Sequence, residues 1–104
     1  MILTYSSEKL EAIINDKRLL KRHYNSDSTK IENRISELIA ANNLNEIPHT
    51  PPPRRHKLTS NYCGCWAVDY SKNDRIVFQP IGDYDENDLN TITKIKIITL
   101  GDYH

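Results

Sequence analysis

The hydrophobic pattern of this chain changes from a helical period to an alternating one after residues 48–53. Before that point, apolar side chains between residues 7 and 24 recur at mostly helical spacing, and Ser6 or Ser7 is available to cap the first turn. The apolar positions are Leu10, Ile13, Ile14, Leu20 and Tyr24. This spacing predicts a helix over residues 7–24.

A second helical pattern follows a polar break at residues 25–28. Thr29 and Glu32 fit a capping box at its start, and the pattern predicts a helix that ends near Asn42 and Asn43. Its apolar positions are Ile31, Ile35, Leu38 and Ile39. Because the connection between the two helices is short and polar, we expect them to pair as an antiparallel hairpin.

Residues 48–53 read Pro-His-Thr-Pro-Pro-Pro, which can neither continue a helix nor donate into a sheet. We expect an extended connection there. The following segment, residues 65–70, alternates between two faces and predicts a strand. One face carries Trp66, Val68 and Tyr70, and the other carries Cys65, Ala67 and Asp69.

The rest of the chain predicts further strands. A turn at residues 71–74 leads into a strand over residues 75–79, which makes a hairpin with the preceding one. A loop rich in Asp and Asn covers residues 80–91, and an isoleucine-rich strand follows over residues 93–100. Residues 1–5 fit an edge strand.

These elements predict an α+β fold in which an N-terminal helical hairpin packs on a small, curved, mainly antiparallel β-sheet. The chain has 104 residues, a length that supports one core, so residues 1–104 are expected to form a single domain. Trp66 is expected in that core.

Charge is balanced overall but unevenly distributed. The 14 basic and 14 acidic residues cancel, yet residues 81–104 are predominantly acidic. Two basic clusters precede that region: Lys17, Arg18, Lys21, Arg22 and His23 form the first, and Arg54, Arg55, His56 and Lys57 form the second. Either cluster could hold phosphates, although a solvated helix face explains the first one equally well.

The two cysteines, Cys63 and Cys65, are separated only by Gly64, a spacing that disfavours a disulfide and supplies at most half of a zinc site. We expect reduced thiols, no metal and no cofactor. The apolar start of the chain is too short for a signal peptide, and no run is long enough to span a bilayer. The expected location is therefore the cytoplasm, without a membrane partner.

Several residues of the second half form a spaced pattern. It contains His56-Lys57-Leu58, then Gly64-Cys65-Trp66, then Arg75 nine residues after Trp66, and finally Asp102-Tyr103-His104. With this pattern, residues 54–104 resemble the HigB-type toxins of the RelE/ParE superfamily. Without it, a terminal histidine would be read as a frayed, solvated side chain.

The resemblance implies the toxin of a type II toxin–antitoxin system, a metal-independent endoribonuclease that cleaves mRNA in the ribosomal decoding site. It also implies a cognate antitoxin, of the helix-turn-helix, HigA-like kind. Such cleavage proceeds by attack of a ribose 2′-OH on the adjacent phosphate, which needs a base, an acid and cations.

The expected catalytic residues are His56, Arg75, Asp102, Tyr103 and His104. Either histidine can be the base or the acid. Arg75 suits a forked phosphate contact, although an ion pair with Asp74 or Asp69 is the alternative. Tyr103 offers a ring for base stacking or a hydroxyl for the phosphate, and Asp102 would orient a histidine or accept a hydrogen bond from a base.

Arg54, Arg55 and Lys57 are the expected RNA-binding residues. Relatives commonly carry a basic residue three positions after the first histidine, where this chain has Thr59. Lys57 could replace it, but strand alternation would direct Lys57 to the face opposite His56, so Arg54 or Arg55 could complete the phosphate clamp instead.

Two alternatives remain open. Some members of the superfamily are non-catalytic and inhibit a protein target such as DNA gyrase, although Asp102-Tyr103-His104 argues against that reading. A zinc-binding module built on Cys63 and Cys65 with a histidine would need a fourth ligand that no recognisable spacing supplies.

Overall fold

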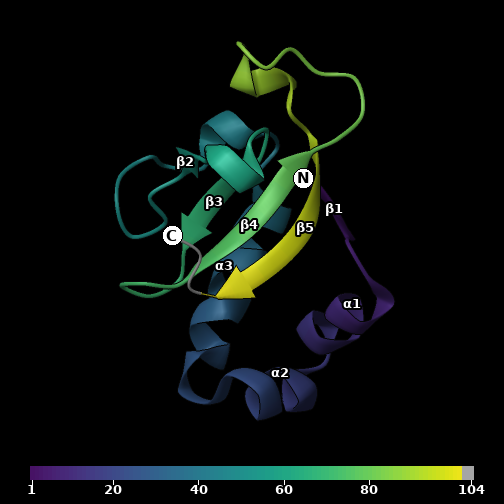
Figure 1. Ribbon diagram of the computed structural model, residues 1–104, viewed down its shortest axis with the longest axis vertical. Helices are drawn as coiled ribbons and strands as arrows, with labels where there is room; N and C mark the ends of the chain where they lie inside the picture. The colour runs from purple at the N-terminus through teal and green to yellow at the C-terminus, as the bar shows by residue number, and fades with distance from the viewer. Residues whose placement is uncertain (102–104) are drawn as a thin grey trace.

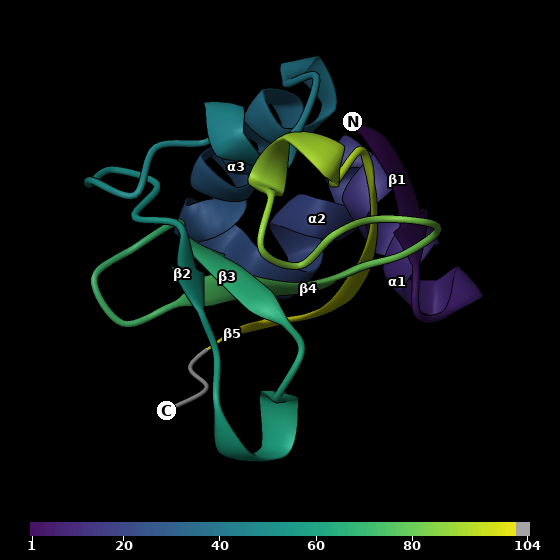
Figure 2. The same cartoon turned by 90° about the horizontal axis from the view of Figure 1, so that it is seen from above.

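The computed structural model describes residues 1–101, so the predicted site residues Asp102, Tyr103 and His104 lie outside the described residues. A five-stranded sheet in the order β1-β5-β4-β3-β2 carries the helices on one face (Figures 1 and 2). Its strands are β1 (Ile2–Tyr5), β2 (His56–Lys57), β3 (Trp66–Asp69), β4 (Arg75–Pro80) and β5 (Lys94–Gly101). The predicted α+β class is confirmed.

The sheet is mixed but mainly antiparallel. β2, β3, β4 and β5 pair with their neighbours in antiparallel fashion, and β1 runs parallel to β5 along the edge. The edge strand expected for residues 1–5 is thereby confirmed. A register shift between Val77 and Phe78 interrupts the β4–β5 ladder, and such bulges increase the local bend and twist of a sheet.

The helical segment expected over residues 7–24 is two helices, α1 (Glu8–Asn15) and α2 (Lys17–Tyr24). The break comes at Asp16, which is extended and whose Oδ1 accepts hydrogen bonds from the backbone N–H groups of Arg18 and Leu19 at 2.9 and 3.4 Å. An aspartate that caps a helix competes with helical continuation, and this is why apolar spacing alone did not locate the break. Ser7 caps α1, accepting from Leu10 N–H at 3.1 Å.

The third helix, α3 (Ser28–Ala40), begins before the predicted capping box. A short 3₁₀ turn, η1 (Asn25–Asp27), leads directly into it, so Thr29 is already helical and the box is not formed. The helix ends at Ala40, two residues before the predicted Asn42.

The core lies between the helices and one face of the sheet. Its fully buried members include Leu20 from α2, Ile31 from α3, Phe78 from β4 and Ile95 from β5. Trp66 is partly buried and packs against this cluster, in agreement with its expected core position. Among residues 1–101, no helix is long and apolar enough to cross a membrane.

Two loops extend from this body. The connection between β2 and β3, which contains η3 (Ser60–Tyr62), projects away from the helical layer in Figure 2. The acidic loop after β4 lies at the end of the molecule opposite α2 in Figure 1. Asp85 and Asp88 are tied to Thr91 there, with Asp85 N–H donating to Thr91 Oγ1 at 2.8 Å and that hydroxyl donating to Asp88 O at 2.6 Å.

Candidate active site

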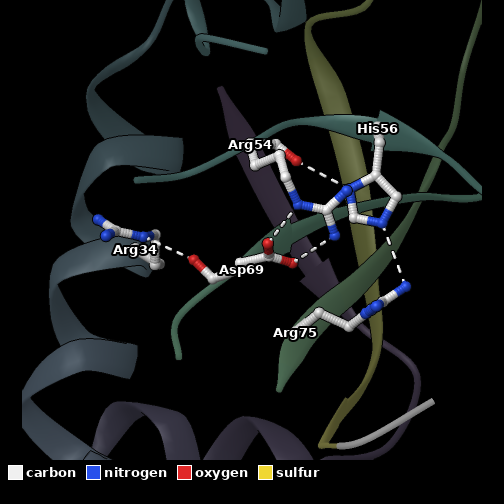
Figure 3. A network of polar contacts seen from close by, with 5 residues as sticks. All are labelled: Arg34, Arg54, His56, Asp69 and Arg75. Atoms are coloured by element: carbon white, nitrogen blue, oxygen red, sulfur yellow. Dashed lines mark hydrogen bonds and ion pairs between the residues drawn. The ribbon is translucent and has the colours of Figure 1, made fainter. Parts of the chain in front are cut away.

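His56 and Arg75 meet on the sheet face that lies away from the helices. Nη1 of Arg75, from the start of β4, is 3.2 Å from Nε2 of His56, from β2 (Figure 3). Both side chains are part-buried. The sequence separates these two residues by eighteen others, and the fold brings together a histidine and an arginine that one spaced sequence pattern had singled out.

The strand register explains why the two side chains share a face. His56 is opposite Ala67, and Ala67 is opposite Val77, so the side chains of this cross-strand row point the same way. Arg75 is two residues from Val77 on the same strand and therefore points to the same face. Ala67 and Val77 are fully buried but do not belong to the helical core cluster, as expected for the opposite face.

The partners of His56 define its tautomer. Nδ1 lies 2.8 Å from the carbonyl oxygen of Arg54, which can only accept, so Nδ1 carries the proton. Nε2 faces the Arg75 guanidinium, which can only donate, so Nε2 presents its lone pair. These contacts select the Nδ1–H tautomer, with Nε2 directed at the arginine.

A forked ion pair flanks this histidine. Nε of Arg54 is 2.6 Å from Oδ2 of Asp69, and Nη2 is 3.2 Å from Oδ1. The backbone carbonyl of Asp69 also accepts from Nε of Arg34 on α3 at 2.8 Å. Arg54 therefore lies beside His56, but its guanidinium is engaged by a carboxylate of its own chain.

The two carboxylates considered as ion-pair partners of Arg75 have other contacts. Asp69 takes the fork of Arg54, and Oδ2 of Asp74 accepts from Ser71 Oγ at 2.8 Å within the β3–β4 turn. The contact of Arg75 that bears on the site is the one with Nε2 of His56.

Arg55 is directed away from His56. Its Nη1 donates to the carbonyl oxygens of Leu44 at 3.1 Å and Ile47 at 2.9 Å, and its guanidinium lies 5.8 Å from the ring centroid of Trp66. Burial lowers the pKa of this guanidinium. These contacts indicate that Arg55 ties the segment after α3 to the sheet.

Lys57 is exposed and opposite Trp66, whose side chain packs on the helical core. It therefore points to the face opposite His56, as strand alternation predicted. The basic cluster on α2 is a solvated helix face, with all five of its side chains exposed. Of the three expected RNA-binding residues, only Arg54 lies next to the His56–Arg75 pair.

The end of β5 leads to this site. Gly101 pairs with Arg75 in the β4–β5 ladder, so the last described residue lies beside the arginine. The expected roles of Asp102, Tyr103 and His104 fall outside the described residues and stay predictions.

Both thiols are free, as expected; Cys63 is exposed and Cys65 is buried. Burial, with a smaller contribution from Cys63, raises the pKa of the Cys65 thiol. Within residues 1–101, no group of three or more His, Cys, Asp or Glu side chains is arranged to hold a metal ion.

Sequence reasoning did not select Asp69 or Arg34 as part of the site. A partial signal existed for Asp69, because strand alternation placed it on the face of Ala67, which is also the face of His56. Nothing in the sequence links Arg34, because its contact depends on how α3 packs against the end of β3.

The sequence matches no protein-family model and no curated protein. The fold, in contrast, matches solved structures over nearly all of the chain. A YoeB/ParE toxin from Agrobacterium tumefaciens superimposes with a TM-score of 0.60 at 14% identity, covering 100% of both chains. YafQ from E. coli strain BL21(DE3) has a TM-score of 0.60 at 17% identity, covering 96% of this chain and 90% of that one.

The YoeB-YefM complex from Staphylococcus aureus contains a further match, with a TM-score of 0.56 at 18% identity, covering 100% of this chain and 97% of the other. Identities this low establish the fold alone. The structural relatives are YoeB-, YafQ- and ParE-type toxins, and the HigB subtype stays a prediction. The chain has the RelE/YoeB-like toxin fold, with His56 and Arg75 together on its open sheet face.

Proposed function

We propose that this chain is the toxin of a type II toxin–antitoxin system, a HigB-like, ribosome-dependent endoribonuclease that cleaves mRNA without a metal or other cofactor. The observation that carries the proposal is the His56–Arg75 pair, in which Nε2 of the imidazole lies 3.2 Å from Nη1 of the guanidinium. A base beside a phosphate-binding cation is what cleavage by a ribose 2′-OH requires.

His56 is proposed as the general base. The N–H groups of Arg75 would donate hydrogen bonds to the substrate phosphate. The Nε2 lone pair of His56 would then be free to accept the 2′-OH proton. The 2′-oxygen then attacks phosphorus, the bond to the 5′-oxygen breaks, and the products are a 2′,3′-cyclic phosphate and a 5′-OH end. Arg75 stabilises the additional negative charge on the phosphoryl oxygens in the transition state.

The departing 5′-oxygen needs a proton, and we assign that role to His104. Gly101, the last described residue, is paired with Arg75, and this supports the assignment. Tyr103 would stack on a base or donate to phosphate, and Asp102 would orient a histidine or contact a base.

The proposed partners follow from the same reaction. The ribosome would present mRNA in its decoding site, so the proposed location of the activity is the cytoplasm. Because the ribosome would hold the mRNA in position, the toxin would not need a strongly basic surface to bind it. A free ribonuclease of this kind must be held inactive by a cognate antitoxin, proposed as a helix-turn-helix, HigA-like protein. The likeness to a toxin solved with YefM supports an antitoxin partner.

The test is cleavage of mRNA by the purified chain, with and without programmed ribosomes, followed by mapping of the new ends. Arg75→Ala should lower the rate by about 10²-fold or more, and Arg75→Lys should recover only part of it because lysine lacks the fork. His56→Ala should cost about 10²- to 10⁴-fold. Lys94→Ala, an exposed cation at the start of β5, is the matched control and should leave the rate unchanged.

His104 is tested by its deletion and by His104→Ala. Each should leave the melting temperature unchanged and remove most cleavage, and full activity in both would exclude it from the reaction. In cells, expression of the chain alone should arrest growth, and co-expression of its antitoxin should relieve the arrest. Growth arrest without mRNA cleavage but with inhibited DNA gyrase would support the non-catalytic alternative instead.

A further inference from the structure

The polar contacts around His56 converge on Asp69, at the end of β3 (Figure 3). Its carboxylate receives the forked contact of Arg54, and its backbone N–H donates to the carbonyl of Pro53 at 2.7 Å. Its own carbonyl is held by Arg34 at 2.8 Å. One residue of the sheet therefore holds the Arg54 side chain and the backbone just before it, and α3 in turn holds that residue.

The backbone of Arg54 needs this support. Its φ of 48° lies in the left-handed region, which is unfavourable for a residue with a Cβ atom and persists only where surrounding contacts impose it. The Arg54 N–H donates to Thr50 O at 3.1 Å and the next N–H, of Arg55, donates to Pro48 O at 2.9 Å. The ion pair to Asp69 is the side-chain contact that joins this tight turn to the sheet, beside the backbone bond from Asp69 N–H to Pro53 O.

The turn affects His56 because it fixes the orientation of the Arg54 carbonyl group. The peptide plane after Arg54 rotates with the dihedral angles of that residue, and its carbonyl oxygen is the acceptor for His56 Nδ1 at 2.8 Å. If the Arg54 side chain were released, the hydrogen bond from Arg55 N–H to Pro48 O would remain to hold this peptide plane, and the carbonyl would be less firmly oriented. His56 Nδ1 would then face a less firmly oriented acceptor, and the preference for its tautomer would weaken.

We propose that Asp69 is a positioning residue that, through Arg54, holds His56 as the Nδ1–H tautomer with Nε2 directed at Arg75. Asp69 and Arg54 act on the histidine and have no role at the phosphate. The consequence for cleavage rests on the proposed function, whereas the effect on the tautomer does not. Arg54, expected from the sequence to bind RNA, is reassigned by this proposal to support of the histidine.

The test uses variants that break the ion pair from either side. Asp69→Asn keeps the size of the side chain and removes its charge, and Arg54→Gln removes the fork. The ring nitrogens of His56 are observed by ¹⁵N NMR at about pH 8, where an ordinary histidine is neutral. Asp27→Asn is the matched control, since this aspartate lies in η1, pairs with Lys30 at 3.8 Å and is outside the network.

The parent protein and Asp27→Asn should show His56 almost entirely as the Nδ1–H form. Asp69→Asn and Arg54→Gln should each raise the Nε2–H form at least several-fold, and the double variant should be no worse than the more severe single one because both remove the same contact. With programmed ribosomes, each should lower kcat about 10- to 100-fold with KM unchanged.

An unchanged His56 tautomer in folded Asp69→Asn or in folded Arg54→Gln would overturn the proposal, and the second variant serves if the first does not fold. A loss of thermal stability without a tautomer change would likewise overturn it, since that is the signature of a purely structural ion pair. A tautomer shift in a protein that cleaves no mRNA in any form would support the positioning role and overturn the ribonuclease assignment. The two proposals therefore fail separately.

Discussion

Arg75 reaches Nε2 of His56 at 3.2 Å although β3 separates the strands that carry the two residues. Neighbouring strands are about 4.8 Å apart, so the two side chains together bridge about 10 Å above the middle strand. Ala67 lies on that strand, opposite His56, and has no exposed surface. A short side chain at this position leaves room for the two long ones to meet.

A larger residue at position 67 should therefore separate the pair. Ala67→Leu is expected to lower cleavage by about 10²-fold through displacement of His56 and Arg75, and to destabilise the fold by about 1–3 kcal/mol through overpacking. Ala12→Leu adds the same atoms to an exposed position of α1 and should change neither. Cleavage rates and urea denaturation give both quantities. Normal cleavage by folded Ala67→Leu would show that this position does not control the pair.

Substitution of Arg55 should lower the free energy of unfolding much more than substitution of Lys57. Arg55→Ala removes the donor to the Leu44 and Ile47 carbonyls and the contact with Trp66, so it should lower the free energy of unfolding by about 2–3 kcal/mol. Lys57→Ala, at an exposed position, should change it by less than about 0.5 kcal/mol. If Arg55→Ala kept full stability and lost RNA binding, the role expected from the sequence would hold instead.

The two cysteines should react at different rates. The thiolate is the reactive form, and burial raises the pKa of Cys65, which lowers its thiolate fraction at neutral pH. Exposed Cys63 should therefore be alkylated by iodoacetamide well before Cys65, and the gap should narrow in denaturant. Mass spectrometry of the modified peptides gives the order, and equal rates in the native protein would contradict the burial of Cys65.

Glu46 should contribute a pH-dependent part of the stability. Its carboxylate accepts from the Asn42 backbone N–H at 2.8 Å and from Asn42 Nδ2 at 3.2 Å, and these hydrogen bonds lower its pKa. A carboxyl group whose pKa is lower in the folded state stabilises the fold above its unfolded value and loses that contribution as pH falls through the folded one. Glu46→Gln should thus be less stable than the parent at pH 7.

The difference between Glu46→Gln and the parent should shrink steadily as the solution is acidified, because protonated Glu46 then resembles glutamine. Urea denaturation across the acid range measures it. Glu86→Gln, in the exposed acidic loop, should show no such trend. A difference that is constant with pH would mean that the charged form of Glu46 has no special role.

Local patterns were sufficient where the determinant of structure is local. The alternation over residues 65–70 predicted β3, because successive side chains of a strand point to opposite faces, and the turn at residues 71–74 predicted that the next strand, β4, begins at Arg75. Apolar spacing likewise located the helices. It missed the break between α1 and α2, since that break depends on one capping side chain, Asp16, and not on the period.

Local patterns were also sufficient for some features of the candidate site. The spacing of His56, Trp66 and Arg75 selected two residues that the fold brings into contact, and strand alternation foresaw that Lys57 would face the other way. The candidate groups, and the strand faces on which they lie, could therefore be predicted from local sequence patterns.

Which charged side chains are engaged by other groups of the chain depends on long-range contacts. Arg54 and Arg55 are neighbours in a basic cluster, yet one is held by Asp69 and the other by the carbonyls after α3. Their partners lie in distant parts of the chain, and a long arginine side chain can reach in many directions from the same backbone. Cross-strand register and helix packing determine which direction each side chain takes. Both depend on contacts between segments that are distant in the sequence, so no local pattern predicts them.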